Sequence, residues 1–258
     1  MPMKSVLTRF DPTRKALIEP TEVVKPVAGF PRICLFAFSR QIIEKVAARP
    51  EVKEIDALYS ANGRIPIYQM DYKGTTMAIT MAAVGAPLCV GFAEEVIAKG
   101  ADILVFFGAC GVLRPDLADG HIVIPDRALR DEGTSYHYAP AADVIDLDPD
   151  VIKKVTQVFQ RLDVPCVTGM TWTTDAFYRE TPAKTRQRRE QGCIVVDMEV
   201  SALAAMAAFR NVTYAQFLYT GDLLGETHWE ARDLADQGMS KSDLYIKVAC
   251  EIGLALSR

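Results

Sequence analysis

The sequence predicts an α/β fold with three layers, α/β/α, around a twisted mixed central sheet. From Arg32 onward, short apolar runs alternate with amphipathic segments, which is typical of strands followed by helices. The run from Ile103 to Phe107 has no polar face, so we expect that strand at the centre of the sheet. A Lys73-Gly74 turn between two apolar runs indicates a hairpin, so antiparallel pairs should accompany the parallel ones.

The same two patterns, apolar runs and amphipathic segments, predict the positions of the other elements. Apolar runs bounded by glycine, proline or polar residues predict the strands, and longer segments with one apolar face predict the helices. We expect strands at 33–38, 64–72, 76–81, 103–107, 122–125, 166–173, 192–196 and 214–219. We expect helices at 41–48, 90–99, 149–161, 183–191, 200–209 and 241–256.

Residues 1–30 differ in character from the rest of the chain. They contain prolines at positions 2, 12, 20 and 26 and show no helical periodicity. We expect an extended leader that lies along the surface or against a partner subunit, followed by a single domain at 31–258. The leader has no apolar stretch of the signal-peptide kind, which favours a cytoplasmic location.

Composition narrows the class of protein. The chain has 258 residues, of which 50% are hydrophobic, enough for one extended core. The net charge is −4, and the densest basic cluster, 184–189, is expected to be a solvated helix face. Nucleic acids and membranes are therefore poor partners. The six cysteines form no CxxC pair and no cluster with histidine, so we expect reduced thiols and no metal site.

Carboxylates follow two apolar strands near the C-terminal end. Asp197, Met198 and Glu199 come directly after the strand at 192–196, and Asp222 follows the strand at 214–219. Because ligands of open α/β sheets bind at the carboxyl ends of the strands, we expect a pocket here. The alternative for each acid is a helix cap or a solvated loop residue, and Asp197, next to a helix start, fits that alternative best.

The segment 195–202, Val-Val-Asp-Met-Glu-Val-Ser-Ala, resembles the Met-Glu signature of the nucleoside phosphorylases of the purine nucleoside and uridine phosphorylase type. Asp222 stands where the purine-acting members carry an aspartate. The resemblance spans roughly residues 32–256 in the same order, through further segments at 83–87, 106–113, 119–125 and 130–135.

The resemblance implies roles for five residues. Glu199 would bind the ribose hydroxyls and stabilise the positive charge that develops on the sugar, with Met198 as an apolar floor. Asp222 would protonate a purine base as it leaves. Phe177 and Tyr178 would stack on the base.

The resemblance also implies a phosphate site, with inorganic phosphate as co-substrate and no other cofactor. Gly108 and Ala109, in a small-residue turn, would bind the anion together with Arg40 and with Arg64, which a neighbouring subunit would lend. We therefore expect a homo-oligomer, at least a dimer.

This region departs from the family in three places. The family loop Gly-x-Pro-x-Arg is replaced by Ala-Phe-Ser-Arg-Gln at 37–41, a family arginine by Phe106, and a hydroxyl residue by Ala109. Arg-Glu-Thr-Pro at 179–182 replaces the glutamine and arginine with which uridine-cleaving relatives bind uracil. Phosphorolysis of a purine nucleoside is the leading hypothesis. The alternatives are hydrolysis of the same bond, a uridine phosphorylase, and a nucleoside-binding protein without activity.

Overall fold

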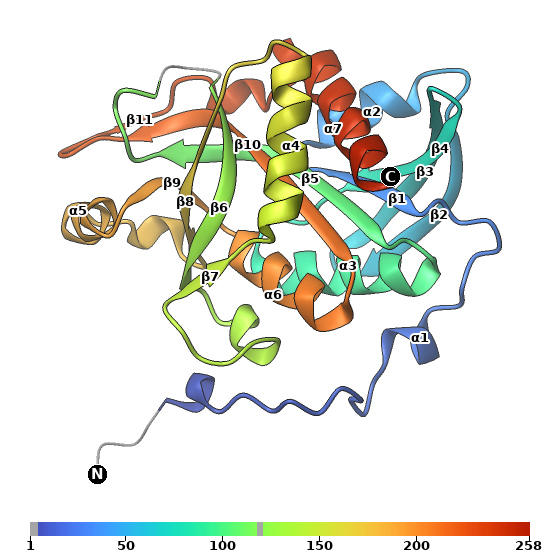
Figure 1. Ribbon diagram of the computed structural model, residues 1–258, viewed down its shortest axis with the longest axis horizontal. Coiled ribbons are helices and arrows are strands. Elements are labelled where there is room, and N and C mark those ends of the chain that lie inside the picture. The colour runs from blue at the N-terminus through green and yellow to red at the C-terminus, as the bar shows by residue number, and fades with distance from the viewer. Residues whose placement is uncertain (1–4, 118–120) are drawn as a thin grey trace.

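An eleven-stranded mixed sheet forms the centre of the computed structural model, which describes residues 5–117 and 121–258 (Figure 1). Residues 1–4 of the leader, and Asp119 and Gly120 of the 119–125 segment, lie outside the described residues. The strands are β1 (Ile33–Ala37), β2 (Lys53–Ser60), β3 (Gly63–Tyr72), β4 (Thr75–Met81), β5 (Ile103–Val112), β6 (Ile122–Asp131), β7 (Val144–Asp146), β8 (Cys166–Thr174), β9 (Cys193–Asp197), β10 (Thr213–Leu224) and β11 (Trp229–Glu230).

The sheet has an open part and a closed part. β1 lies between β4 and β5 and is parallel to both, and the hairpin β2–β3 continues the open side antiparallel to β4. On the other side, β5, β10, β6, β8 and β9 pair in a closed circuit, because β5 binds β9 at one edge and β10 at the other. Closure pairs strand edges that would otherwise be open.

Helices cover both faces of the sheet, as predicted. Figure 1 shows α4 and α7 on one side and α3 and α6 on the other, which makes the three layers. The helices are α1 (Pro20–Val23), α2 (Arg40–Ala47), α3 (Ala86–Lys99), α4 (Pro149–Arg161), α5 (Pro182–Glu190), α6 (Val200–Arg210) and α7 (Ser242–Leu256).

Each face of the sheet has its own apolar core. Phe36 and Phe106 belong to the core beneath α3 and α6, whereas Phe107 and Phe217 belong to the core beneath α4 and α7. Phe106 and Phe107 are consecutive residues of β5 and are both fully buried, as expected for a central strand with no polar face.

The predicted elements are confirmed with two kinds of difference. β5 and β10 extend five residues beyond the predicted ends at 107 and 219, because they pair with each other through the small-residue segment. The strands β2, β7 and β11 have no counterpart in the prediction. α3 begins at Ala86, with Pro87 in its first turn, where proline needs no hydrogen-bond donor.

The leader crosses the outside of α3 and α6 (Figure 1). The guanidinium of Arg14 donates to the carbonyl oxygen of Phe209, and Glu19 lies 3.4 Å from the guanidinium of Arg210. The backbone N–H of Val27 donates to the carbonyl oxygen of Lys99. Two short helical segments, 6–8 and α1, interrupt the otherwise extended leader.

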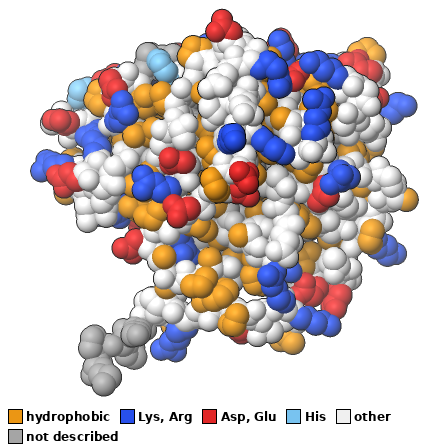
Figure 2. All heavy atoms as spheres, viewed as in Figure 1, with side chains coloured by type: hydrophobic (Ala, Val, Ile, Leu, Met, Phe, Trp, Pro, Cys, Tyr) orange, Lys and Arg blue, Asp and Glu red, His pale blue; other side chains and the backbone are white. Residues whose placement is uncertain are grey.

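The surface charges, the helix lengths and the cysteines can be compared with the predictions about partners and metals. Basic and acidic side chains are interspersed on the face drawn in Figure 2. In the part of the chain that the structure describes, no helix is long and apolar enough to cross a membrane, and no three His, Cys, Asp or Glu side chains group as metal ligands would. The six cysteines are free thiols, and five of them are buried.

Candidate functional site

The candidate site lies around the second half of β5. The segment Gly108 to Gly111, predicted to be a turn, is a continuation of this strand, so that prediction is wrong. Gly111 pairs with Val196 of β9 on one side and with Asp222 of β10 on the other. A Cβ atom on Gly111 would lie 2.8 Å from Cγ1 of Val196, so glycine permits this close approach of strands.

The structure brings the acids together for a different reason from the predicted one. β9 is antiparallel to β5 and β10 is parallel to it, so the carboxyl ends of β9 and β10 do not share an edge. Asp222 also lies within β10, two residues before its end. The two acidic segments flank β5 because β10 continues past Gly221, where the pairing register shifts.

Glu199 follows β9 and is 6% exposed. The backbone N–H of Gly85, at the start of α3, donates to its Oε1 at 2.6 Å. Burial raises the pKa of Glu199 to about 8, and the nearby charge of Asp197 acts in the same direction. Glu199 is thus a buried carboxyl group that holds its proton more tightly than an exposed glutamate, because of burial and the charge of Asp197.

Asp197 has a structural role, as the capping alternative predicted. Its Oδ2 accepts hydrogen bonds from the backbone N–H groups of Glu199 and Val200 at 2.7 and 2.6 Å. Its Oδ1 accepts from the hydroxyl groups of Thr171 and Thr173, each at 2.9 Å. These four bonds engage both oxygens of Asp197 and fix the start of α6, and with it the position of Glu199.

Asp222 is half-buried and bound by the indole of Trp229. Nε1 of Trp229 donates to Oδ2 of Asp222 at 2.6 Å. Burial raises the pKa of Asp222, and the bond from Trp229 opposes that rise. A carboxyl group with a raised pKa holds its proton to a higher pH than an exposed aspartate does.

Glu180 is a candidate site residue that the sequence analysis missed. It is half-buried, burial raises its pKa to about 7, and the charge of Asp222 is the second cause. The signal available in the sequence was an acid two residues after the predicted aromatic pair.

The aromatic pair and Met198 lie near these acids in the chain. Phe177 and Tyr178 form a helical turn that ends next to Glu180, with ring centroids 4.2 Å apart. Phe177 is 50% exposed and Tyr178 is 89% exposed, so both rings are available to a ligand or a partner. Met198 is half-buried between Asp197 and Glu199.

The two arginines predicted to bind phosphate each pair with a carboxylate of the same chain. Arg40, the first residue of α2, has an 80% exposed side chain paired with Glu44 at 2.7 Å. Arg64 lies in the β2–β3 hairpin and pairs with Glu54. Ala109 is half-buried in β5 and offers no hydroxyl group.

The ring of Phe38 covers Gly108. A Cβ atom on Gly108 would lie 2.7 Å from both Cβ and Cδ2 of Phe38. Phe106, two residues before, stacks on Phe36 with centroids 4.2 Å apart and is fully buried. Apolar side chains therefore pack against Gly108, which the resemblance assigned to phosphate binding.

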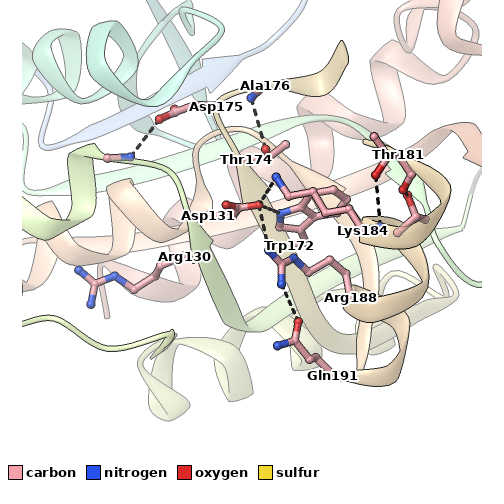
Figure 3. A network of polar contacts seen from close by, with 12 residues as sticks. Arg130, Asp131, Trp172, Thr174, Asp175, Ala176, Thr181, Lys184, Arg188 and Gln191 are labelled. Atoms are coloured by element: carbon pink, nitrogen blue, oxygen red, sulfur yellow. Dashed lines mark hydrogen bonds and ion pairs between the residues drawn. The ribbon is translucent and has the colours of Figure 1, made fainter. Parts of the chain in front are cut away.

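A polar network supports the loop that follows β6 (Figure 3). One oxygen of Asp131 accepts from Nε1 of Trp172 at 2.9 Å and lies 2.7 Å from Lys184 and 3.2 Å from Arg188. Both cations lie over the Trp172 ring. The expectation that this basic helix, α5, is merely solvated is therefore wrong, because these two cations bind a half-buried acid.

The same loop connects to the site through Gly133, whose N–H donates to Asp175 at 2.9 Å (Figure 3). Glu132 accepts from the hydroxyl group of Ser201 in α6, also at 2.9 Å. These contacts join the ends of β6 and β8 to the helix that follows Glu199.

Comparison with known proteins identifies the family. The family model described as phosphorylase superfamily matches residues 32–250. The chain belongs to the phosphorylase superfamily. The matched region begins just after the leader and contains Glu199, Asp222, Phe38 and Phe106.

Curated relatives of this superfamily protein include enzymes named for purine and for uridine. It is 30% identical to the purine nucleoside phosphorylase of Plasmodium vivax over 55% of this chain and 59% of that protein. It is 28% identical to a DeoD-type purine nucleoside phosphorylase of Caldanaerobacter subterraneus over 70% of this chain and 78% of that protein. A uridine phosphorylase of Thermococcus kodakarensis is 32% identical over 42% of this chain and 39% of that protein. The chain spans about three fifths of the length of the first curated relatives that it matches.

Solved structures show the same fold. The purine nucleoside phosphorylase of Toxoplasma gondii in complex with immucillin-H aligns with a TM-score of 0.75 at 19% identity, covering 91% of this chain and 98% of that one. The uridine phosphorylase of Vibrio fischeri aligns with a TM-score of 0.70 at 19% identity, covering 88% and 91%. The predicted fold class is therefore confirmed.

The raised pKa of Glu199 predicts that stability falls as pH rises. An unfolded glutamate loses its proton near its ordinary value of 4.5, whereas the folded protein keeps this proton up to about pH 8. Stability from this group is therefore present below pH 4.5 and is lost as pH rises through 8. We expect Glu199→Gln to flatten the fall in thermal midpoint over this window, measured by calorimetry. The exposed control Glu190→Gln should keep the wild-type slope, and an unchanged slope in Glu199→Gln would contradict the assignment.

Proposed function

We propose that the protein is an enzyme that cleaves the N-glycosidic bond of a nucleoside, with purine nucleosides favoured. The observation that carries the proposal is the buried carboxyl group of Glu199, held by the N–H of Gly85, with Asp222 on the far side of β5. Breaking this bond builds positive charge on the sugar ring and negative charge on the base. The site offers a carboxylate for the first and a proton donor for the second.

Each group has a step in the proposed reaction. Glu199 accepts hydrogen bonds from ribose hydroxyls and stabilises the positive charge that develops on the ring. Met198 supplies a polarizable apolar floor to the sugar. Phe177 and Tyr178 stack on the base while Asp222 gives it a proton.

The preference for purines depends on Asp222 and gains support from Glu180. A purine leaving group accepts a proton at N7, which pyrimidines lack, so an acid at the base is useful for purines alone. Burial raises the pKa of Glu180 to about 7, with the charge of Asp222 as the second cause, so Glu180 can hold a proton near neutral pH. Because the named relatives include both purine nucleoside and uridine phosphorylases, uridine phosphorylase activity stays an alternative.

The acceptor of the sugar has two candidates. Phosphate, giving the free base and ribose 1-phosphate, is the co-substrate implied by the names of the relatives, and no other cofactor is proposed. Water is the second candidate, and the packing of Phe38 on Gly108 favours it. A nucleoside-binding protein without activity is the remaining alternative.

The test is release of free base from inosine, adenosine, guanosine and uridine, with and without phosphate, followed by chromatography. We expect base from at least one purine nucleoside. Binding of a nucleoside without any release of base would contradict the proposed enzyme and support the binding-protein alternative. A cytoplasmic location stays a prediction.

The homo-oligomer also stays a proposal. The exposed apolar side chains of Leu17 and Ile18 in the leader, and the exposed ring of Tyr178, suit a subunit contact. Arg64, at the tip of the β2–β3 hairpin, is the residue proposed to reach a neighbouring pocket. We expect sedimentation to give at least a dimer, with Arg64→Ala weakening nucleoside affinity without unfolding the protein. A stable and active monomer would contradict the shared site.

A further inference from the structure

The carboxyl ends of β1, β4 and β5 form the edge of the sheet beside Glu199. These three strands are parallel, and helices α2 and α3 follow β1 and β4. At such an edge, anions are ordinarily bound by the N–H groups of a helix start and by cationic side chains. Gly85, which binds Glu199, lies in the connection between β4 and α3. A reactant that approaches the sugar from this edge therefore meets the residues that follow β1 and line β5.

Those residues are aromatic. The backbone N–H of Phe38 donates to the carbonyl oxygen of Phe107 at 3.0 Å, which holds Phe38 at the end of β1 with its ring on Gly108. The Phe38 and Phe106 ring centroids lie 6.1 Å apart, and Tyr214 meets Phe106 edge-on at 5.8 Å. Together with Phe36, these rings form a continuous, largely buried apolar cluster next to Gly108.

Several groups that could bind an anion already have partners within this chain. The hydroxyl oxygen of Ser39 accepts from the N–H of Ile42, so a side chain of the protein caps α2. The two arginines that the resemblance assigns to phosphate, Arg40 and Arg64, each pair with a carboxylate of the same chain.

The charges around the site also oppose a dianion. Asp197, Glu199 and Asp222 surround β5, and burial and the charge of Asp197 raise the pKa of Glu199. Phosphate would add negative charge to an acidic and partly apolar space, which is costly without paired cations. Binding of an uncharged water molecule carries no such electrostatic cost.

We infer that the acceptor at this site is water, and that the ring of Phe38 on Gly108 closes the space that a phosphate anion would need. This inference rests on the proposed function, because it names the second substrate of the same reaction. The protein is then a nucleoside hydrolase within a superfamily whose named relatives are phosphorylases.

The reaction balances with groups already in the site. The water oxygen bonds to C1′ of the ribose while the bond from C1′ to the base nitrogen breaks, and that electron pair leaves with the base. The ionised fraction of Glu199, which grows as pH approaches 8, takes one proton of the water, and Asp222 gives one proton to the base. Exchange with solvent restores both groups, so one water is consumed and free ribose and free base are formed.

The first experiment uses the wild-type protein. Base release from a purine nucleoside is measured in phosphate-free buffer and again with phosphate added. We expect rates that agree within about twofold, and free ribose that carries the label when heavy-oxygen water is used. Turnover that requires phosphate and yields ribose 1-phosphate overturns the inference and leaves the proposed function intact. Failure to cleave any nucleoside under either condition overturns the proposed function and the inference together.

A second measurement does not depend on turnover. Phosphate alone should leave the thermal midpoint of the wild-type protein unchanged, whereas Phe38→Arg, which replaces the ring with a cation, should gain a rise of about 3 °C or more. The matched control is Phe209→Arg, at a half-buried phenylalanine of α6 away from Gly108. A phosphate-dependent rise in the wild-type protein overturns the inference, even if Phe38→Arg does not fold.

Discussion

Glu199→Gln should lower turnover of a purine nucleoside by about 10²-fold or more. The amide keeps an oxygen to accept the N–H of Gly85, so the local structure should be preserved. It loses the ability to carry the negative charge that offsets the developing charge on the sugar. Steady-state kinetics should show the loss mainly in kcat, because the interaction strengthens in the transition state.

Glu94→Gln is the matched control for this prediction. Glu94 is also 6% exposed, but it pairs with Arg210 on the side of α3 that faces the leader. This substitution removes an equally buried charge away from Gly85 and should leave kcat near the wild-type value. Near-wild-type activity in Glu199→Gln, with an unchanged far-ultraviolet spectrum, would remove Glu199 from the reaction.

Asp222→Asn should lower kcat/KM for inosine or guanosine by about 10²-fold, the usual contribution of a general acid. The amide can still accept the N–H of Trp229, so that β10 and β11 stay in place, but it cannot give a proton to N7. Turnover of a pyrimidine nucleoside, if any, should change much less, and the ratio of the two effects is the measurement.

Asp71→Asn serves as the control for Asp222. Asp71 is an exposed aspartate of β3 that accepts a hydrogen bond from Thr76 at 2.7 Å. Its change to asparagine should alter neither substrate class. Equal losses on purine and pyrimidine nucleosides in Asp222→Asn, or a wild type that cleaves uridine but no purine nucleoside, would contradict the assigned role.

The sequence by itself determined the fold class and named most of the candidate site residues. Alternating periodicities predict α4 at its observed bounds and β5 as a buried central strand, because side-chain burial imposes these local patterns. The Met-Glu segment indicates the family, which the match over residues 32–250 confirms. The helix-capping alternative for Asp197 also follows from its place before α6, and its bonds to Glu199 and Val200 agree with it.

Only the tertiary structure decided how these residues meet. The closed circuit of β5, β10, β6, β8 and β9 depends on pairing between segments far apart in the chain, which local periodicity does not encode. For that reason the segment after Phe107 was predicted to be a turn, although pairing with β10 keeps it extended. The position of Phe38 has the same origin. Its ring rests on Gly108 because β1 and β5 are neighbours, and this contact is the observation on which the proposed water acceptor depends.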